Sequence, residues 1–420
     1  MNLKTLNLTV LLITILVLVP TIQIVYASPL STFFLSGGIY PHGVSFTAWK
    51  ESNTYYAKTS YGLQTTFSGT TNGSLFIQNI MDAVSASEGN VFFKKAEYEF
   101  DVGVHVDLRG GKGNIKLDAE KGTVFKATQD LVNLVWLCMF EFYGGDGVTI
   151  SNIIFDLANT ETSYVFMFGG YNATNNVEIC YCSFINGIDP ITHYQSMAIV
   201  SSRGSHYNIH NNYFEDFEQG IVIGCGGTHQ DSINIYENDF QSVGHAINLE
   251  RGTPTYTWHG VIVANNIING SGYARNSTNV QDGINIFGYG DVDGCVVSGN
   301  HIIFDVGTNA TGIRLTQINY AEVVNNIVSG ANRTPNESDL WQNGGGIWIR
   351  ACNFSNIAGN NILNSYYGIG LVNYGATVGS YYNRLNNNGC WGAEGINILN
   401  STTGTNNEFH LSWNGTTWIS

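Results

Sequence analysis

The sequence has few charged residues, and cations are the scarcer kind. Only 12% of its 420 residues are charged, with 17 Lys and Arg against 32 Asp and Glu. So few cations provide little to neutralise a phosphate backbone, which argues against nucleic acid as a partner. Disorder driven by charge is also excluded, because disordered chains combine low hydrophobicity with high net charge. Here 43% of the residues are hydrophobic, so the chain can bury a core.

Proline, methionine and cysteine are also scarce, with 6, 5 and 7 residues, whereas glycine reaches 49. A chain rich in glycine and poor in helix formers favours strands and turns over long helices. The few cysteines do not define a disulfide scaffold, and their odd number leaves at least one unpaired. Cys180 and Cys182 lie close together, but no CxxC or HxxxH spacing accompanies them. We interpret both as small core or turn residues and predict no metal site.

The first residues have the pattern of a secretion signal. Lys4 precedes an apolar run from Leu8 to Val19, and Val25-Tyr26-Ala27 places small residues where a signal peptidase cleaves. We expect residues 1–27 to be a signal peptide and the mature protein to be extracellular or at the cell surface. Asn-x-Ser/Thr sequences, such as the one at Asn172, would make it a glycoprotein. The alternative is an uncleaved membrane anchor, because the apolar run has about the length that spans a bilayer.

One pattern, apolar-x-apolar-x-x-Asn-x-apolar, returns down the chain about every 26 to 34 residues. Its asparagines are Asn212, Asn238, Asn266, Asn300, Asn326 and Asn360, with Cys182 in the same position of an earlier copy. A second motif follows about half a period later, as in Gly220-Ile-Val-Ile223 and Gly283-Ile-Asn-Ile286. Each unit therefore holds two short alternating strands separated by turns.

Alternation with period two buries one face of each strand, and units too short to bury that face alone must stack. A coil of parallel strands, one turn per unit, satisfies both demands. The recurring asparagine fits this geometry, because it tolerates the left-handed conformation of a sharp bend and stacked copies can hydrogen-bond to one another. The sequence therefore predicts an all-β solenoid.

A helix-like segment precedes the repeats. Residues 74–87 have apolar residues at helical spacing, and strand-like segments follow at Gly89–Phe93 and Tyr98–Phe100. This order resembles the opening of the pectin lyase-like superfamily, in which an amphipathic helix plugs the end of a right-handed parallel β-helix. The resemblance covers about residues 45–402. It implies a fold rather than one activity, because that superfamily holds lyases, hydrolases, epimerases, tailspikes and non-catalytic surface proteins.

The resemblance and the repeats together predict a domain organisation. We expect an aromatic and Thr-rich lead-in at residues 28–73 and a right-handed parallel β-helix of about ten coils at residues 74–402. Residues 74–87 would be its capping helix. A C-terminal cap or tail would occupy residues 403–420.

Columns of side chains can be read from the repeat, because equivalent residues of successive coils stack about 4.8 Å apart. The outward column of the second motif contains Asn248, Asn285, Arg314 and Trp348, and Arg350 lies two residues beyond Trp348. Amides can bind hydroxyls, a guanidinium can bind a carboxylate, and an indole can stack on a sugar ring. The column predicts a substrate-binding strip for polysaccharide, with an ordinary exposed face as the alternative.

A neighbouring column contains candidate catalytic residues. His245 and Asp282 occupy equivalent positions one coil apart, near enough for the carboxylate to orient the imidazole. A hydrolase would need two carboxylates, for which Glu218, Glu250 and Asp282 are the candidates. The alternative is that these are structural turn residues.

A lyase would need a different set of groups: a base for the proton alpha to a uronate carboxylate, and a cation to neutralise that carboxylate. His245 or Arg251 could be the base, with Arg314 as the cation. Arg251 would also extend the substrate-binding strip.

These residues predict an extracellular protein that binds a polysaccharide or cell-surface glycan and acts on an acidic, uronate-containing glycan as a lyase or hydrolase. The alternative is a non-catalytic surface or adhesive protein whose coils form a stiff rod. No cofactor is predicted. An acidic loop such as Asp291-Val-Asp293 supplies too few oxygen ligands to support a calcium site. A membrane is a partner only if the N-terminal segment stays uncleaved.

Overall fold

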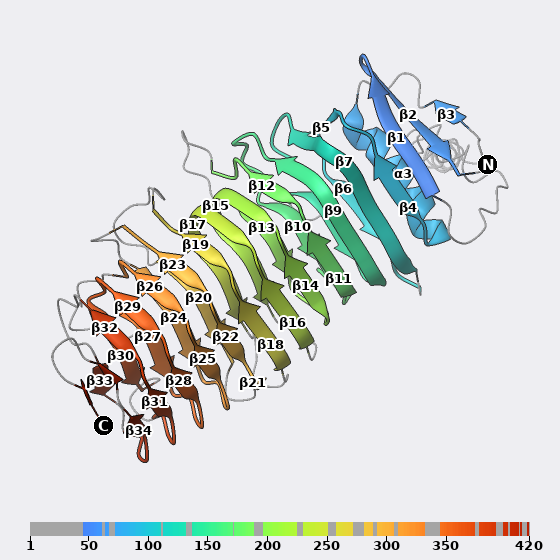
Figure 1. Cartoon of the computed structure of the whole chain (residues 1–420). Coiled ribbons are helices and arrows are strands. Elements are labelled where there is room, and N and C mark those ends of the chain that lie inside the picture. Colours follow the sequence, from blue (N-terminus) through green and yellow to red (C-terminus); the bar gives the residue numbers. More distant parts are fainter. Residues whose placement is uncertain are drawn as a thin grey trace, which may run out of the picture. The chain divides into compact units, whose positions relative to one another are not determined.

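The computed structural model describes residues 45–60, 64–66, 72–110, 112–131, 137–170, 172–188, 196–224, 230–250, 258–271, 281–288, 292–305, 310–331, 345–373, 378–391, 398–401, 404–410, 412–413 and 418–419. The predicted signal peptide and Arg251 lie outside these residues. Within the described part of the chain, no helix is long and apolar enough to cross a membrane. The described elements all belong to the compact unit Gly43–Ser420, whose strands coil into a right-handed parallel β-helix (Figure 1). The predicted fold class is confirmed.

The β-helix has three columns of stacked parallel strands, and each coil from β4 to β33 contributes to all three in turn. The first column contains β4 (Asn90–Phe93), β7 (Gly113–Ala127), β9 (Asp146–Asp156), β11 (Asn175–Cys180), β14 (Tyr207–His210), β16 (Gln230–Tyr236), β18 (Trp258–Ala264), β22 (Val296–Ser298), β25 (Glu322–Val324), β28 (Asn356–Ala358), β31 (Arg384–Asn386) and β34 (Glu408–His410).

The second column shares its long strands with the other two columns. It contains β5 (Glu97–Phe100), β7, β9, β12 (Ser183–Ile185), β15 (Tyr213–Gly224), β17 (Asp239–Glu250), β19 (Ile267–Asn269), β23 (His301–Ile303), β26 (Ile327–Ser329), β29 (Asn361–Leu363), β32 (Gly389–Trp391) and β35 (Ser412–Trp413). The third contains β6 (Val104–Asp107), β8 (Cys138–Tyr143), β10 (Tyr164–Phe168), β13 (Met197–Ser201), β15, β17, β20 (Gln281–Phe287), β24 (Ala310–Thr316), β27 (Gly345–Arg350), β30 (Tyr367–Val372) and β33 (Ile398–Ser401). Two short strands lie beside these columns: β21 (Val292–Asp293), parallel to β18, and β36 (Trp418–Ile419), antiparallel to β35.

A hairpin and a helix precede the first coil. β1 (Ser45–Glu51) pairs antiparallel with β2 (Thr54–Thr59) and parallel with β4, and β3 (Gln64–Thr66) extends the hairpin. The predicted helix is α3 (Gly73–Ser87), which begins where the Asn72 side chain accepts a hydrogen bond from the Leu75 backbone N–H at 3.1 Å. Its apolar face is buried, and Phe76 stacks on Tyr55 of the hairpin with ring centroids 5.2 Å apart. The helix therefore covers apolar surface at the start of the coil.

Three columns appear where the sequence predicted two strands per unit, because the asparagine motif spans a bend. In the copy at Ile209 to Phe214, Ile209 lies in β14 of the first column and Phe214 in β15 of the second. Both side chains are buried. Phe214 stacks on Phe184 and Phe240 of the adjacent coils, with centroids 4.8 and 4.6 Å apart. Because of the bend, the apolar residues on both sides of it, Ile209 and Phe214, pack into the same core.

The asparagines at this bend form a continuous hydrogen-bonded column, which we call the asparagine ladder. It contains Asn212, Asn238, Asn266, Asn300, Asn326, Asn360 and Asn388, all buried. Asn266 shows the repeating unit: its Nδ2 donates to Asn300 Oδ1 at 2.9 Å and to the Ile235 carbonyl at 3.1 Å. Its Oδ1 accepts from both the backbone N–H and Nδ2 of Asn238. Each rung therefore ties its coil to the coils before and after it.

The ladder asparagine is not the left-handed residue that the sequence predicted. Positive φ falls instead on the residue before each ladder position, at Asn211, Glu237, Asn265, Gly299, Asn325, Gly359 and Asn387. The left-handed residue makes the bend, and the asparagine after it turns its side chain inward to the ladder. Asn-Asn pairs occur in four of these copies because asparagine suits both positions, for different reasons.

Removing one rung should destabilise the fold strongly. Asn266→Ala deletes the bonds to Asn300 and Ile235 and removes the acceptor of the buried Asn238 backbone N–H, whereas Asn238 Nδ2 keeps its bonds to the Ile209 and Tyr236 carbonyls. A buried group without a partner costs about 1–3 kcal/mol, and each lost hydrogen bond costs about 1 kcal/mol more. We expect a loss of more than about 3 kcal/mol, measured as a lower urea midpoint. Asn269→Ala is the control, because Asn269 lies on the same coil as Asn266 but is only half-buried, and its Nδ2 donates to Gln241 Oε1 on the preceding coil at 3.0 Å. Equal shifts for the two variants would contradict the role of the ladder.

Candidate functional site

The two predicted columns of candidate site residues are in register. Parallel pairing places Gln219, His245, Asp282 and Thr311 at one position of β15, β17, β20 and β24. The same strands place Asn248, Asn285 and Arg314 at a second position, three residues further along each strand. We call these seven residues the polar flank.

A bend in the strands brings the two columns of the polar flank together. Gly220 has no room for a side chain, because a Cβ there would lie 2.6 Å from the Phe240 ring in the core. Gly220 and Ile221 are both buried, so the alternation breaks there, and the residues that flank this pair, Gln219 and Val222, are both partly exposed. Side chains of the two columns therefore converge, and Asn248 Nδ2 donates to Gln219 Oε1 at 3.2 Å.

Asp282 is the centre of the polar flank. Its carboxylate is only 5% exposed and lies between two cationic or potentially cationic side chains. Arg314 Nη2 lies 2.8 Å from Oδ1, and His245 Nδ1 lies 3.5 Å from Oδ2. Burial raises the pKa of Asp282, but Arg314 and His245 together outweigh burial and hold the pKa below its usual value. Asp282 is therefore an anion that can orient the imidazole.

Amides and a hydroxyl complete the polar flank. Asn285 Nδ2 donates to Asn248 Oδ1 at 2.9 Å, which continues the amide chain from Gln219 across three coils. Arg314 Nη2 also donates to Thr311 Oγ1 at 3.2 Å. Both of these contacts are made by Nη2 of the half-buried guanidinium. Nη1 and Nε take part in neither of them. The flank thus offers amide groups, a guanidinium and an imidazole side by side.

The two remaining residues of the predicted strip are buried. Trp348 pairs with Arg314 in register, but it is only 2% exposed. Its indole covers Gly370 of the next coil, where a Cβ would lie 2.5 Å from the ring, and it meets the Tyr367 ring edge to face. Arg350 is 7% exposed. The prediction that these two side chains lie on an open strip is wrong, because the glycine at 370 lets the indole fold down against the coil.

The other two candidate carboxylates, Glu250 and Glu218, lie further from Asp282 than His245 and Arg314 do. Glu250 is exposed at the end of β17, and the five residue steps from His245 to Glu250 span roughly 16 Å at about 3.3 Å per residue. Paired carboxylates of glycoside hydrolases are about 5–9.5 Å apart. Glu218 lies next to Gln219, and β15 is two coils from β20. The geometry does not assemble the carboxylate pair of a hydrolase from Glu250 and Asp282.

Sequence reasoning missed a row of exposed aromatic rings on another part of the surface. Tyr320, Phe354 and Tyr382, which we call the aromatic ladder, follow positions joined by parallel bridges between coils. Their rings stack with centroids 5.2 and 5.0 Å apart and interplanar angles of 13° and 1°. The signal was present as an aromatic residue at the same repeat position of three successive units.

A second missed group combines Glu178, Cys180 and His210 on β11 and β14. The repeat alignment places Cys180 and His210 at equivalent positions, each two residues before the position of the ladder. Metal-ligand spacing along the chain does not reveal a cluster formed between coils.

The comparisons with known proteins concern the fold. No protein-family model matches the chain, and no curated protein matches it in sequence. Among solved structures it is similar to DFA-IIIase from Arthrobacter chlorophenolicus A6 in complex with GF2, with a TM-score of 0.52 and 12% identity over 81% of this chain and 90% of that chain. It is also similar to the surface protein and adhesin PfbA of Streptococcus pneumoniae, with a TM-score of 0.46 and 13% identity over 83% of this chain and 96% of that chain. At these identities the similarity shows the β-helix fold alone.

The ion pairs of Asp282 should make stability depend on pH. A carboxylate whose pKa is lower in the folded chain stabilises the fold above its unfolded pKa of about 3.9, and this stabilisation is lost as the pH falls through the folded pKa. Asp282→Asn should therefore lower stability at pH 7 by about 1–3 kcal/mol. The difference should shrink below about pH 4.

The measurement is a series of urea unfolding curves from pH 7 to pH 3. Asp293→Asn is the matched control, because Asp293 is exposed on β21 and should show little difference at any pH. A deficit of Asp282→Asn that stays constant down to pH 3 would contradict the ionised pair.

Proposed function

We propose that the protein binds a polysaccharide along the polar flank as an extracellular protein. The observation that carries this proposal is the unbroken run of amide, imidazole and guanidinium groups on consecutive coils around Asp282. Neighbouring strands lie about 4.8 Å apart, so groups repeat along the flank on the scale of one sugar ring. Hydroxyls and carboxylates of a glycan are the partners that these side chains bind.

The finer proposal is elimination at a uronate residue. His245 would take the proton alpha to the uronate carboxylate, with Asp282 holding the imidazole in place. Arg314 would bind the substrate carboxylate through Nη1 and Nε, since Nη2 contacts Asp282 and Thr311. The electrons of the broken C–H bond form a carbon–carbon double bond, and the glycosidic oxygen leaves with its bonding pair and takes up a proton. Elimination fits the flank better than hydrolysis, because it needs one base rather than two nearby carboxylates.

A non-catalytic adhesive protein is the second candidate, and the aromatic ladder favours it. Tyr320, Phe354 and Tyr382 expose a row of ring edges outside the polar flank. Single exposed apolar residues are ordinary, but a contiguous exposed row is typical of a contact surface. In this case the β-helix would present the aromatic ladder to another surface and would not turn over a substrate.

The catalytic proposal predicts new ultraviolet absorbance when the protein is incubated with uronate polysaccharides. His245→Gln should reduce that rate by about 10²–10⁴, the usual contribution of a general base, while leaving glycan affinity nearly unchanged. Asp282→Asn should also reduce the rate, because the imidazole loses the group that orients it. Retardation in glycan-affinity gels measures binding separately from turnover.

Glu322→Gln is the control for both variants, because Glu322 is an exposed carboxylate on β25 in the first column. It should leave rate and retardation unchanged. Reducing ends without ultraviolet absorbance would replace elimination with hydrolysis. Retardation without any product would support the adhesive candidate, and neither retardation nor product with any glycan would reject the polysaccharide proposal.

A further inference from the structure

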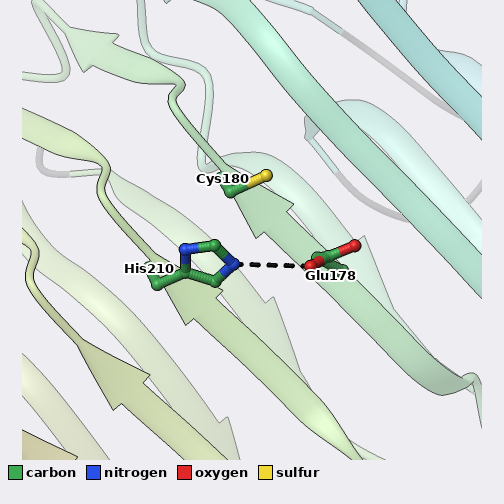
Figure 2. Close-up of side chains that lie close together, drawn as sticks. All are labelled: Glu178, Cys180 and His210. Carbon is green, nitrogen blue, oxygen red and sulfur yellow. Dashed lines mark hydrogen bonds and ion pairs between the residues drawn. The ribbon is translucent and has the colours of Figure 1, made fainter.

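Three side chains with different metal-binding atoms converge on the first column, away from the polar flank. Glu178 and Cys180 are two residues apart on β11 and therefore point to the same face. His210 on β14 pairs with Cys180 in register. The carboxylate, thiol and imidazole atoms all lie within 4.8 Å of one another, and Figure 2 shows them side by side.

The imidazole of His210 is held in an orientation that suits a metal ligand. Asn211 Nδ2 donates to Glu237 Oε2 at 3.0 Å, which fixes the amide and turns Asn211 Oδ1 toward His210 Nδ1 at 2.9 Å. An oxygen acceptor at Nδ1 holds a proton on Nδ1, so Nε2 is the ring nitrogen that can exchange its proton for a metal ion. That atom faces Glu178 (Figure 2). Metal-bound histidines typically have the other ring N–H held in this way.

The surroundings hold the ring and leave a route to solvent. His210 stacks on Tyr236 with centroids 4.8 Å apart and planes 5° from parallel. Cys180 and His210 are buried, whereas Glu178 remains partly open to solvent. An ion could therefore enter past Glu178 and reach ligands that are already oriented.

The donor set selects the kind of ion. Magnesium and calcium prefer oxygen ligands, whereas one sulfur, one nitrogen and one oxygen suit zinc. Zinc bonds of about 2.0–2.3 Å in a tetrahedron put neighbouring donors roughly 3.3–3.8 Å apart. His210 Nε2 and Glu178 Oε1 are already 3.4 Å apart. We propose that Glu178, Cys180 and His210 bind a zinc ion and leave its fourth coordination position open.

The test uses the full chain without a histidine tag, reduced and stripped of metal with a chelator. Calorimetric titration with Zn²⁺ should show one equivalent bound at this site. Titration with Co²⁺ should give visible absorption together with a sulfur-to-cobalt charge-transfer band, which reports the thiolate directly. Cys180→Ser should abolish that band and weaken Zn²⁺ binding by more than about 100-fold.

Glu178→Gln distinguishes loss of a ligand from misfolding, because this partly exposed side chain can change without disturbing the core. This variant should weaken Zn²⁺ binding by about 10- to 100-fold. Cys295→Ala and His301→Gln are the matched controls, since they remove a thiol and an imidazole elsewhere and should bind Zn²⁺ as the wild type does. Zn²⁺ binding that is absent from the wild type, or unchanged in both Cys180→Ser and Glu178→Gln, would overturn the proposal. A Co²⁺ form without a sulfur band would do the same.

Discussion

The asparagine ladder is the interaction on which the rest of the structure depends. Each buried amide donates to the next rung and accepts from the previous one, so a coil can shift its register only by breaking bonds on both sides. Backbone pairing alone would tolerate a slip, because parallel ladders are evenly spaced. The amides add a side-chain restraint once per coil. Residues at equivalent repeat positions are therefore held next to one another, however long the loops between them are.

Both clusters of reactive side chains follow from that restraint. His245 meets Asp282, and Cys180 meets His210, because each pair occupies one position on adjacent coils. Reactive side chains that are far apart in the sequence become neighbours on adjacent strands. The two clusters differ in composition: Asp282 is an anion balanced by Arg314, whereas Glu178, Cys180 and His210 combine a carboxylate, a thiol and an imidazole.

The fold and the pairings could be predicted from the sequence, whereas exposure could not. Alternation and the recurring asparagine report backbone pairing, and this is why His245 and Asp282 could be placed together. The burial of Trp348 depends on Gly370, a residue on another coil that gives no signal in the motif around Trp348. The left-handed residue was misplaced by one position because asparagine occurs at both positions of the bend. The cluster at Cys180 gives no spacing signal along the chain, because its side chains come from two adjacent coils.

A double-mutant cycle between neighbouring rungs tests this account most directly. Asn266 and Asn300 share a hydrogen bond of 2.9 Å, whereas Asn266 and Asn360 lie in coils that do not touch. Alanine substitutions at Asn266 and Asn300 should be coupled by about 1–3 kcal/mol in urea unfolding. The Asn266 and Asn360 pair should add within about 0.5 kcal/mol. Additive effects for the neighbouring pair would show that the amides do not hold adjacent coils in register.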